Sequence, residues 1–244
     1  MAGHSKWANI RFRKGAQDAK RGKIFTKLIR EISVAARTGG SDESSNARLR
    51  DAITKALKAN MKRDTIDNAI KRGVGGLEGQ NMIEMRYEGY GPGGVAILVD
   101  CLSDNKNRTV SEVRHAFTKH GGNLGTDGSV AYLFNKQGEI LLTKGQAEEK
   151  AIEVAIEAGA EDVMLEEGKI EVITAAENYH AVLATLQQTN FEIEQSQLTM
   201  RAQTSVPLDK DSALTLLKLI DMLEDLDDVQ EVYCNAEYPD SIFE

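Results

Sequence analysis

The first forty residues carry the side chains of this chain that are best suited to holding phosphate groups. Ten Lys and Arg residues stand there against Asp18 and Glu31, a net charge of +8, whereas the 244-residue chain as a whole carries −8. Cationic side chains neutralise phosphates and release their counterions, so such binding weakens steeply as salt rises. Trp7 and Phe12 lie among these cations, and aromatic rings can stack on unpaired bases, with a core-anchoring role for Trp7 as the alternative. We therefore predict a nucleic-acid-binding surface made of Lys6, Trp7, Arg11, Arg13, Lys14, Lys20, Arg21, Lys23, Lys27 and Arg30.

A second polar sequence, Asn105-Lys106-Asn107-Arg108, opens a predicted helix. Amide donors, cations and the free N–H groups of a helix N-terminus can together hold a phosphate. The same residue types also cap helices without any ligand. Asn105, Lys106, Asn107 and Arg108 are therefore secondary candidates for phosphate contact, with capping as the alternative.

The charge is divided unevenly along the chain. Residues 1–73 carry a net charge of +11, and the remaining 171 residues carry −19. Charges that serve only solubility would be interspersed, so this segregation favours a polyanionic partner for the N-terminal part.

Other chemistries find little support. Gly89–Gly94 fits the dinucleotide pattern G-x-G-x-x-G, but a strand follows where that motif needs a helix, so we predict a tight hairpin. No histidine forms H-E-x-x-H, and Cys101 and Cys234 lack metal-ligand spacing. No G-x-S-x-G nucleophile motif is present either. We predict a protein that is not an enzyme and that uses no cofactor and no metal.

The sequence also suggests a compartment. Cys101 and Cys234 lie in apolar contexts typical of reduced core thiols. Basic residues interrupt the N-terminus before a signal-peptide core could form, and no apolar run approaches the roughly 18 residues that span a bilayer. We expect a cytoplasmic protein with no membrane partner, while the oligomeric state stays open.

The predicted surface must be positioned by helices. Residues 1–20 lack an apolar period and are read as an arm that orders on binding. From Lys20 to Arg37 the apolar residues recur at helical spacing, opposite a basic face. Two further short helices follow, the third beginning near Asp64, so residues 1–76 are predicted to form a basic arm and a three-helix domain. The predicted buried stripes are Phe25, Leu28, Ile29 and Ile32, then Leu49, Ile53, Ala56 and Leu57, then Ile66, Ala69 and Ile70.

The rest of the chain alternates between strands and helices. We predict strands at Met82–Tyr90, Val95–Cys101 and Ser129–Phe134, with a helix ending near Lys119. From Glu139 to Met200 the order is β-α-β-β-α-β, the ferredoxin-like arrangement. A helix capped by Asp209 and a strand at Val229–Cys234 are predicted to complete the sheet begun at Met82. The fold class is therefore α+β multidomain: residues 77–129 plus 206–244 form a discontinuous α/β domain, and residues 130–205 form an inserted ferredoxin-like α/β domain.

Several motifs together resemble the YebC/PmpR family. They are Met1–Ile10, Arg13–Lys23, Tyr87–Gly94, Asp104–Thr109 and Gly121–Gly125, and the resemblance covers the whole chain. It implies three domains and a DNA-binding transcriptional regulator. Some members are related to the mitochondrial translational activator of cytochrome oxidase. Resemblance to these members implies instead a role at the ribosome, including relief of stalling at proline runs. Lys62 departs from the family pattern, in which a proline often starts the third helix.

Three hypotheses follow from these patterns. The first is a nucleic-acid-binding regulator of transcription that contacts DNA phosphates through the arm and the first helix. The alternative is a ribosome-associated translation factor that binds ribosomal RNA or tRNA. The third is an adaptor whose acidic domains bind a basic protein. No helix-turn-helix pattern with a base-reading helix is visible, so the sequence does not predict sequence-specific readout.

Overall fold

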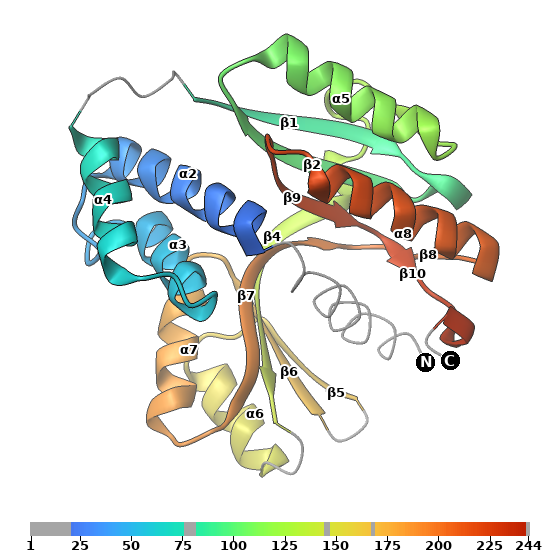
Figure 1. Cartoon of the computed structure of the whole chain (residues 1–244). Helices are drawn as coiled ribbons and strands as arrows, with labels where there is room; N and C mark the ends of the chain where they lie inside the picture. Colours follow the sequence, from blue (N-terminus) through green and yellow to red (C-terminus); the bar gives the residue numbers. More distant parts are fainter. Residues whose placement is uncertain (1–20, 76–81, 144–146, 167–168, 243–244) are drawn as a thin grey trace. The chain divides into compact units, whose positions relative to one another are not determined.

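The computed structural model describes residues 21–75, 82–143, 147–166 and 169–242 (Figure 1). The chain divides into two compact units. One comprises Tyr132–Ser205, and the other comprises the described residues before Tyr132 together with those from Val206 onward. The fold is mixed α+β, as predicted, and its buried residues form three separate hydrophobic clusters. The three-domain division and its boundaries stay a prediction.

Helices α2 (Arg21–Gly39), α3 (Ala47–Lys58) and α4 (Arg63–Val74) share the first cluster. The predicted stripes are confirmed in almost every position, because their side chains are buried or packed against this cluster. Leu57 is the exception, since 46% of it is exposed at the end of α3. Helix α4 begins at Arg63, near the predicted Asp64, but its N-cap is Lys62, and Asp64 lies in its first turn instead of capping it.

A buried amide fixes the turn between α2 and α3. Asn46 accepts a hydrogen bond from the backbone N–H of Leu49 at 3.0 Å and so caps α3. Its Nδ2 donates to the carbonyl oxygens of Ala35 and Gly40, each at 2.8 Å. One side chain thus satisfies backbone groups at the end of one helix and the start of the next.

The first sheet has the strand order β3-β1-β2-β9. Its strands are β1 (Ile83–Tyr90), β2 (Ala96–Ser103), β3 (Asn123–Leu124) and β9 (Val229–Cys234). Strand β9 pairs antiparallel with β2, which confirms that the chain returns to complete this sheet. Helices α5 (Lys106–Lys119) and α8 (Lys210–Asp225) cover one face, with Phe117 and Leu216 fully buried beneath them (Figure 1).

Asp209 caps α8, as predicted. A short parallel pair, β8 (Val206–Pro207) with β10 (Ala236–Glu237), and a 3-10 turn, η4 (Asp240–Ile242), complete this part.

The glycine-rich segment between β1 and β2 is a hairpin turn. Pro92–Gly94 forms the short 3-10 helix η2, with Gly93 and Gly94 at positive φ. Strand β2 follows directly, so the prediction of a tight hairpin is confirmed.

One predicted strand is wrong. Residues 129–134 were read as a strand, but Ala131–Leu133 forms the 3-10 helix η3. Strand β4 begins only at Phe134 and runs to Leu142, so it is longer than the predicted Glu139–Leu142. The apolar run at residues 130–134 marked burial of Val130 and Phe134, and such a run does not by itself distinguish a strand from a turn.

The unit Tyr132–Ser205 has the predicted ferredoxin-like order. After β4 come α6 (Glu148–Glu157), β5 (Asp162–Glu166), β6 (Lys169–Ala175), α7 (Tyr179–Gln188) and β7 (Ile193–Ala202). The sheet order is β5-β6-β4-β7, antiparallel throughout. Helices α6 and α7 pack on one face (Figure 1). Arg201 of β7 reaches Glu139 at 3.1 Å and Glu171 at 3.0 Å, pairing two buried carboxylates of neighbouring strands.

A second buried carboxylate site fixes the segment that leads into β4. Glu88 of β1 accepts hydrogen bonds from the backbone N–H groups of Gly128, Val130 and Ala131, each at 2.7 Å. Burial raises the pKa of Glu88, but these donors stabilise the charged form and bring the pKa below its usual value. The ionised carboxylate therefore holds residues 128–131, which lead into the unit Tyr132–Ser205.

We expect Glu88→Gln to lower the free energy of unfolding by about 2 kcal/mol at neutral pH, because hydrogen bonds to a charged acceptor contribute roughly 1.5–3 kcal/mol. A depressed folded-state pKa stabilises the protein above the unfolded value of about 4.3 and loses that contribution as pH falls. Urea unfolding from pH 7 to pH 3 should thus show a shallower acid loss in the variant. Glu149→Gln, at an exposed carboxylate, is the control. Equal pH profiles for Glu88→Gln and the wild type would contradict this account.

Candidate nucleic-acid interface

The basic face of α2 lies against the end of α8. Lys23 Nζ donates to the carbonyl oxygen of Asp225 at 3.0 Å, and Lys27 Nζ donates to that of Glu224 at 2.5 Å. Arg30 Nη1 donates to the carbonyl oxygen of Asp227 at 2.7 Å. The last carbonyls of a helix lack intrahelical partners and carry the negative end of its dipole. Three of the predicted phosphate-binding cations therefore have an acceptor within the protein itself.

These three cations are not equally available. The side chain of Lys23 is 48% exposed, whereas that of Arg30 is 24% exposed. Burial lowers the pKa of Lys27, although the nearby Glu224, Glu231 and Asp225 act to raise it. Lys27 and Arg30 are thus largely enclosed by the protein, and Lys23 keeps about half of its side chain in solvent.

The buried carboxylate of Asp228 organises the loop after α8. It accepts hydrogen bonds from Ser103 Oγ and Thr109 Oγ1, both at 2.9 Å, and from Arg108 at 2.8 Å. Arg30 Nη1 approaches the same carboxylate at 3.4 Å. Burial raises the pKa of Asp228. The hydrogen bonds from Arg108, Thr109 and Ser103 together lower it by more than burial raises it, so the pKa lies below its usual value. Asp228 therefore joins β2, α5 and α2.

The secondary candidates divide between two roles. Asn105 accepts a hydrogen bond from the backbone N–H of Arg108 at 3.0 Å and caps α5, so the capping alternative holds for this residue. Arg108 pairs with Asp228 and also with Asp104 at 2.9 Å. Lys106 and Asn107 are exposed. Among the described residues, Lys106 and Asn107 form neither an ion pair nor a helix cap, unlike Arg108 and Asn105.

Most of the predicted arm lies outside the residues that the structure describes. This holds for Lys6, Trp7, Arg11, Arg13, Lys14 and Lys20, and for the side chain of Arg21. The reading of residues 1–20 as an arm that orders on binding also falls there and stays a prediction.

Two more ion pairs join the helices to the first sheet. Arg48 of α3 lies 2.5 Å from Glu84 of β1, and Lys55 lies 2.9 Å from Glu231 of β9. Together with the contacts of α2, they show basic residues before Gly73 meeting acidic residues after it. Part of the charge segregation in the sequence is therefore internal complementarity, which sequence reasoning did not anticipate.

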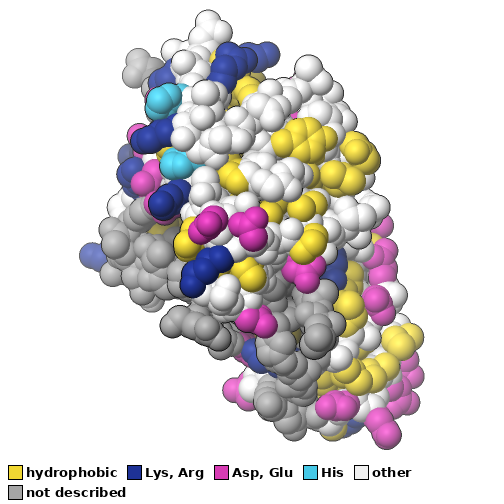
Figure 2. Space-filling model, turned by 90° about the vertical axis from the view of Figure 1, so that its right-hand side faces the viewer, with side chains coloured by type: hydrophobic (Ala, Val, Ile, Leu, Met, Phe, Trp, Pro, Cys, Tyr) yellow, Lys and Arg dark blue, Asp and Glu magenta, His cyan; other side chains and the backbone are white. Residues whose placement is uncertain are grey.

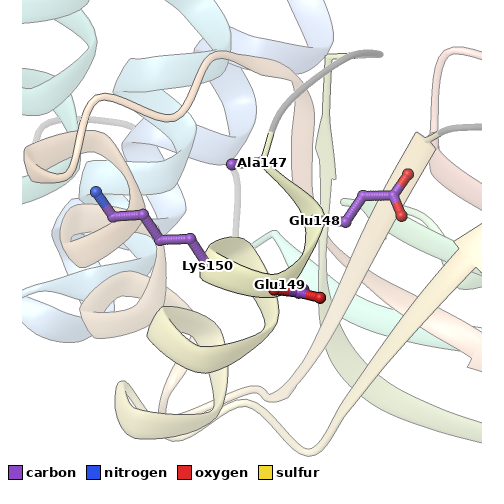
Figure 3. Close-up of a pocket in the computed structure, with 4 residues that line it drawn as sticks. All are labelled: Ala147, Glu148, Glu149 and Lys150. Atoms are coloured by element: carbon purple, nitrogen blue, oxygen red, sulfur yellow. The ribbon is translucent and has the colours of Figure 1, made fainter.

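A surface hollow of about 450 Å³ lies at the start of α6 and is lined, among the described residues, by Ala147, Glu148, Glu149 and Lys150. Figure 3 shows the side chains of Glu148 and Lys150 extending in opposite directions, so they do not converge on a common point. Among the described residues, no group of three His, Cys, Asp or Glu side chains could hold a metal ion. No helix in the same residues is long and apolar enough to cross a membrane.

Comparison with known proteins places the chain in a family. Residues 5–76 match the N-terminal domain of TACO1/YebC proteins, and residues 82–236 match the TACO1/YebC second and third domain. These two matches cover most of the chain, which therefore belongs to the TACO1/YebC family.

The relatives cover the full length. A probable transcriptional regulatory protein of Legionella pneumophila (strain Philadelphia 1) is 75% identical over 244 residues, covering 100% of this chain and 99% of the relative. One of Idiomarina loihiensis is 63% identical over 243 residues, covering 99% and 98%. The crystal structure of a conserved hypothetical protein from Aquifex aeolicus is 48% identical, covers 93% of this chain and 94% of its own, and has a TM-score of 0.80. The family assignment and the fold are thereby shown.

We expect Asp228→Asn to lower the free energy of unfolding by about 2–3 kcal/mol, because it removes a buried charge on which two hydroxyls and two guanidinium groups converge. Asp227→Asn is the matched control, since the Asp227 side chain is exposed and only its backbone carbonyl binds Arg30. That control should stay within about 0.5 kcal/mol of the wild type. Urea unfolding measures both, and equal losses would show that the Asp228 cluster is not the source of stability.

Proposed function

We propose that this protein regulates transcription in the cytoplasm by binding the phosphate backbone of DNA through its N-terminal arm. The arm supplies Lys6, Arg11, Arg13, Lys14 and Lys20, and Arg21 and Lys23 form the base of the surface at the start of α2. Close relatives are named probable transcriptional regulatory proteins, which supports a role in transcription.

The observation that carries the proposal is the charge of the arm in the sequence. Residues 1–20 contain five Lys and Arg residues against the single acid Asp18. Among the described residues, by contrast, Lys27, Arg30 and Arg108 have acceptors within the protein. The arm's excess of cations on a chain of net charge −8 supports a polyanionic partner.

The other predicted residues take lesser places in the proposed surface. Lys27 and Arg30 would contact phosphates only in competition with the carbonyl oxygens of Glu224 and Asp227. At the start of α5, the exposed Lys106 and Asn107 are proposed for phosphate contact, while Asn105 and Arg108 support the turn that presents them.

Structured RNA, in the ribosome or in tRNA, is the second candidate partner. Trp7 and Phe12 stand among the arm cations, and stacking on aromatic rings requires bases that are unpaired. Double-stranded DNA does not offer such bases, so these two side chains favour a partner with unpaired bases, as structured RNA has in its loops.

We expect Arg11→Gln/Arg13→Gln to weaken binding to labelled duplex DNA and to reduce the slope of log K against log salt by about 1.8, since each phosphate contact contributes about 0.9. Fluorescence anisotropy between 50 and 200 mM salt measures both quantities. Lys136→Gln/Lys150→Gln removes the same charge from exposed positions and should leave the slope unchanged. A wild-type affinity that does not depend on salt would overturn the proposal.

The class of nucleic acid is decided by crosslinking in cells followed by sequencing of the recovered material. Enriched promoter DNA is expected if the protein acts in transcription. Recovery of mainly ribosomal RNA or tRNA would replace that function by a role in translation, whereas recovery of neither would leave a protein partner.

A further inference from the structure

The outer side of α5 and α8 carries a group of basic side chains that the proposed function does not use. His115 and Lys119 are exposed on α5, His120 is half-buried at its C-cap, and Lys218 is exposed on α8. We call these four residues the α5–α8 basic surface. The opposite sides of both helices face the sheet, with Phe117 and Leu216 buried in the core. Figure 2 shows histidine side chains beside Lys and Arg along the upper left edge of the face in view.

The basic side chains of this surface lie close together. Burial lowers the pKa of His120, and the nearby Lys119, Lys218 and His115 lower it further. Among the described residues, none of the four side chains forms an ion pair. His115 and Lys119 are spaced i, i+4, which places the imidazole and the ammonium group side by side on one helix face. An anion bound here would gain two ammonium partners from neighbouring helices.

The surface lies close to the point where the arm joins the folded protein. Lys23, in the first turn of α2, binds the carbonyl oxygen of Asp225 in the last turn of α8. Lys218 precedes Asp225 by two helical turns, about 10 Å along α8 at 1.5 Å per residue. One strand of duplex DNA advances about 3.4 Å per nucleotide, so that distance corresponds to about three phosphates.

We propose that His115, Lys119, His120 and Lys218 form a second phosphate-contacting surface for the same nucleic acid that the arm binds. The inference rests on the proposed function, because the arm delivers the strand to α8. The contacts are electrostatic and read no bases, so the surface adds affinity at every sequence alike. It also gives the acidic α/β part of the chain a direct role in binding.

The test is Lys119→Gln/Lys218→Gln in the full-length protein, with labelled duplex DNA and a structured RNA as separate probes. We expect binding at 100 mM salt to weaken roughly three- to tenfold and the DNA salt slope to fall by about 1.8, two phosphates' worth. Lys136→Gln/Lys150→Gln again removes two exposed cations from another region and should match the wild type. Thermal melting by circular dichroism confirms folding, and Lys218→Gln alone serves if the double variant melts early.

The outcomes separate the two proposals. If Arg11→Gln/Arg13→Gln weakens binding but the α5–α8 double variant behaves like its control, this inference is wrong and the arm proposal stands. If the wild type binds neither probe in a salt-dependent way, both are wrong. Loss at one sequence alone would also contradict the inference, because it would indicate base readout.

Discussion

The buried carboxylate of Asp228 is the interaction on which the unit that contains the first sheet depends most. A charge taken out of water is costly unless donors surround it, and here Ser103, Thr109, Arg108 and Arg30 all face it. These donors come from a strand end, two positions of α5 and the first helix. Removing the carboxylate would take its buried acceptor from two guanidinium groups, leaving Arg108 with Asp104 and Arg30 with the carbonyl oxygen of Asp227. The loop after α8 is therefore a structural centre, although it contains no regular secondary structure of its own.

The C-terminal end of α8 and the loop after it supply oxygen acceptors to the cations of α2. A helix C-terminus attracts cations for the same reason that a phosphate does, because both present several oxygen acceptors with partial or full negative charge. Lys23, Lys27 and Arg30 meet such oxygens within the protein. A cationic face in a sequence thus indicates an anionic partner but does not say whether that partner is another molecule. The cations that face solvent are the better guide to an external ligand.

The sequence predicted local features well and long-range polar contacts poorly. The stripes of α2, α3 and α4, the cap Asp209 and the ferredoxin-like order follow from spacing and cap chemistry that act within a few residues. Asp228 could not be predicted, because its donors Ser103 and Arg108 lie far away in the chain and their pairing depends on the sheet. The only sequence signal was an acidic pair, Asp227 and Asp228, directly after an apolar helix. The strand predicted at residues 129–134 failed for a related reason: Glu88 of β1 binds those backbone N–H groups, so they are not available to a ladder.

The pairing of β4 with β7 bears on how the second unit is accommodated within the chain. Phe134, near its beginning, lies directly opposite Ala202, near its end, in an antiparallel register. Antiparallel partners of this kind lie about 5 Å apart, so both ends of the unit leave from nearly the same point. Once this unit has folded, its two ends are held next to each other. The segments before and after it are then joined by what is in effect a short connection. The entropy of bringing Ala131 and Val206 together is then nearly independent of the length of the segment between them. The first sheet can therefore assemble from sequence-distant halves as though the intervening residues were a small turn.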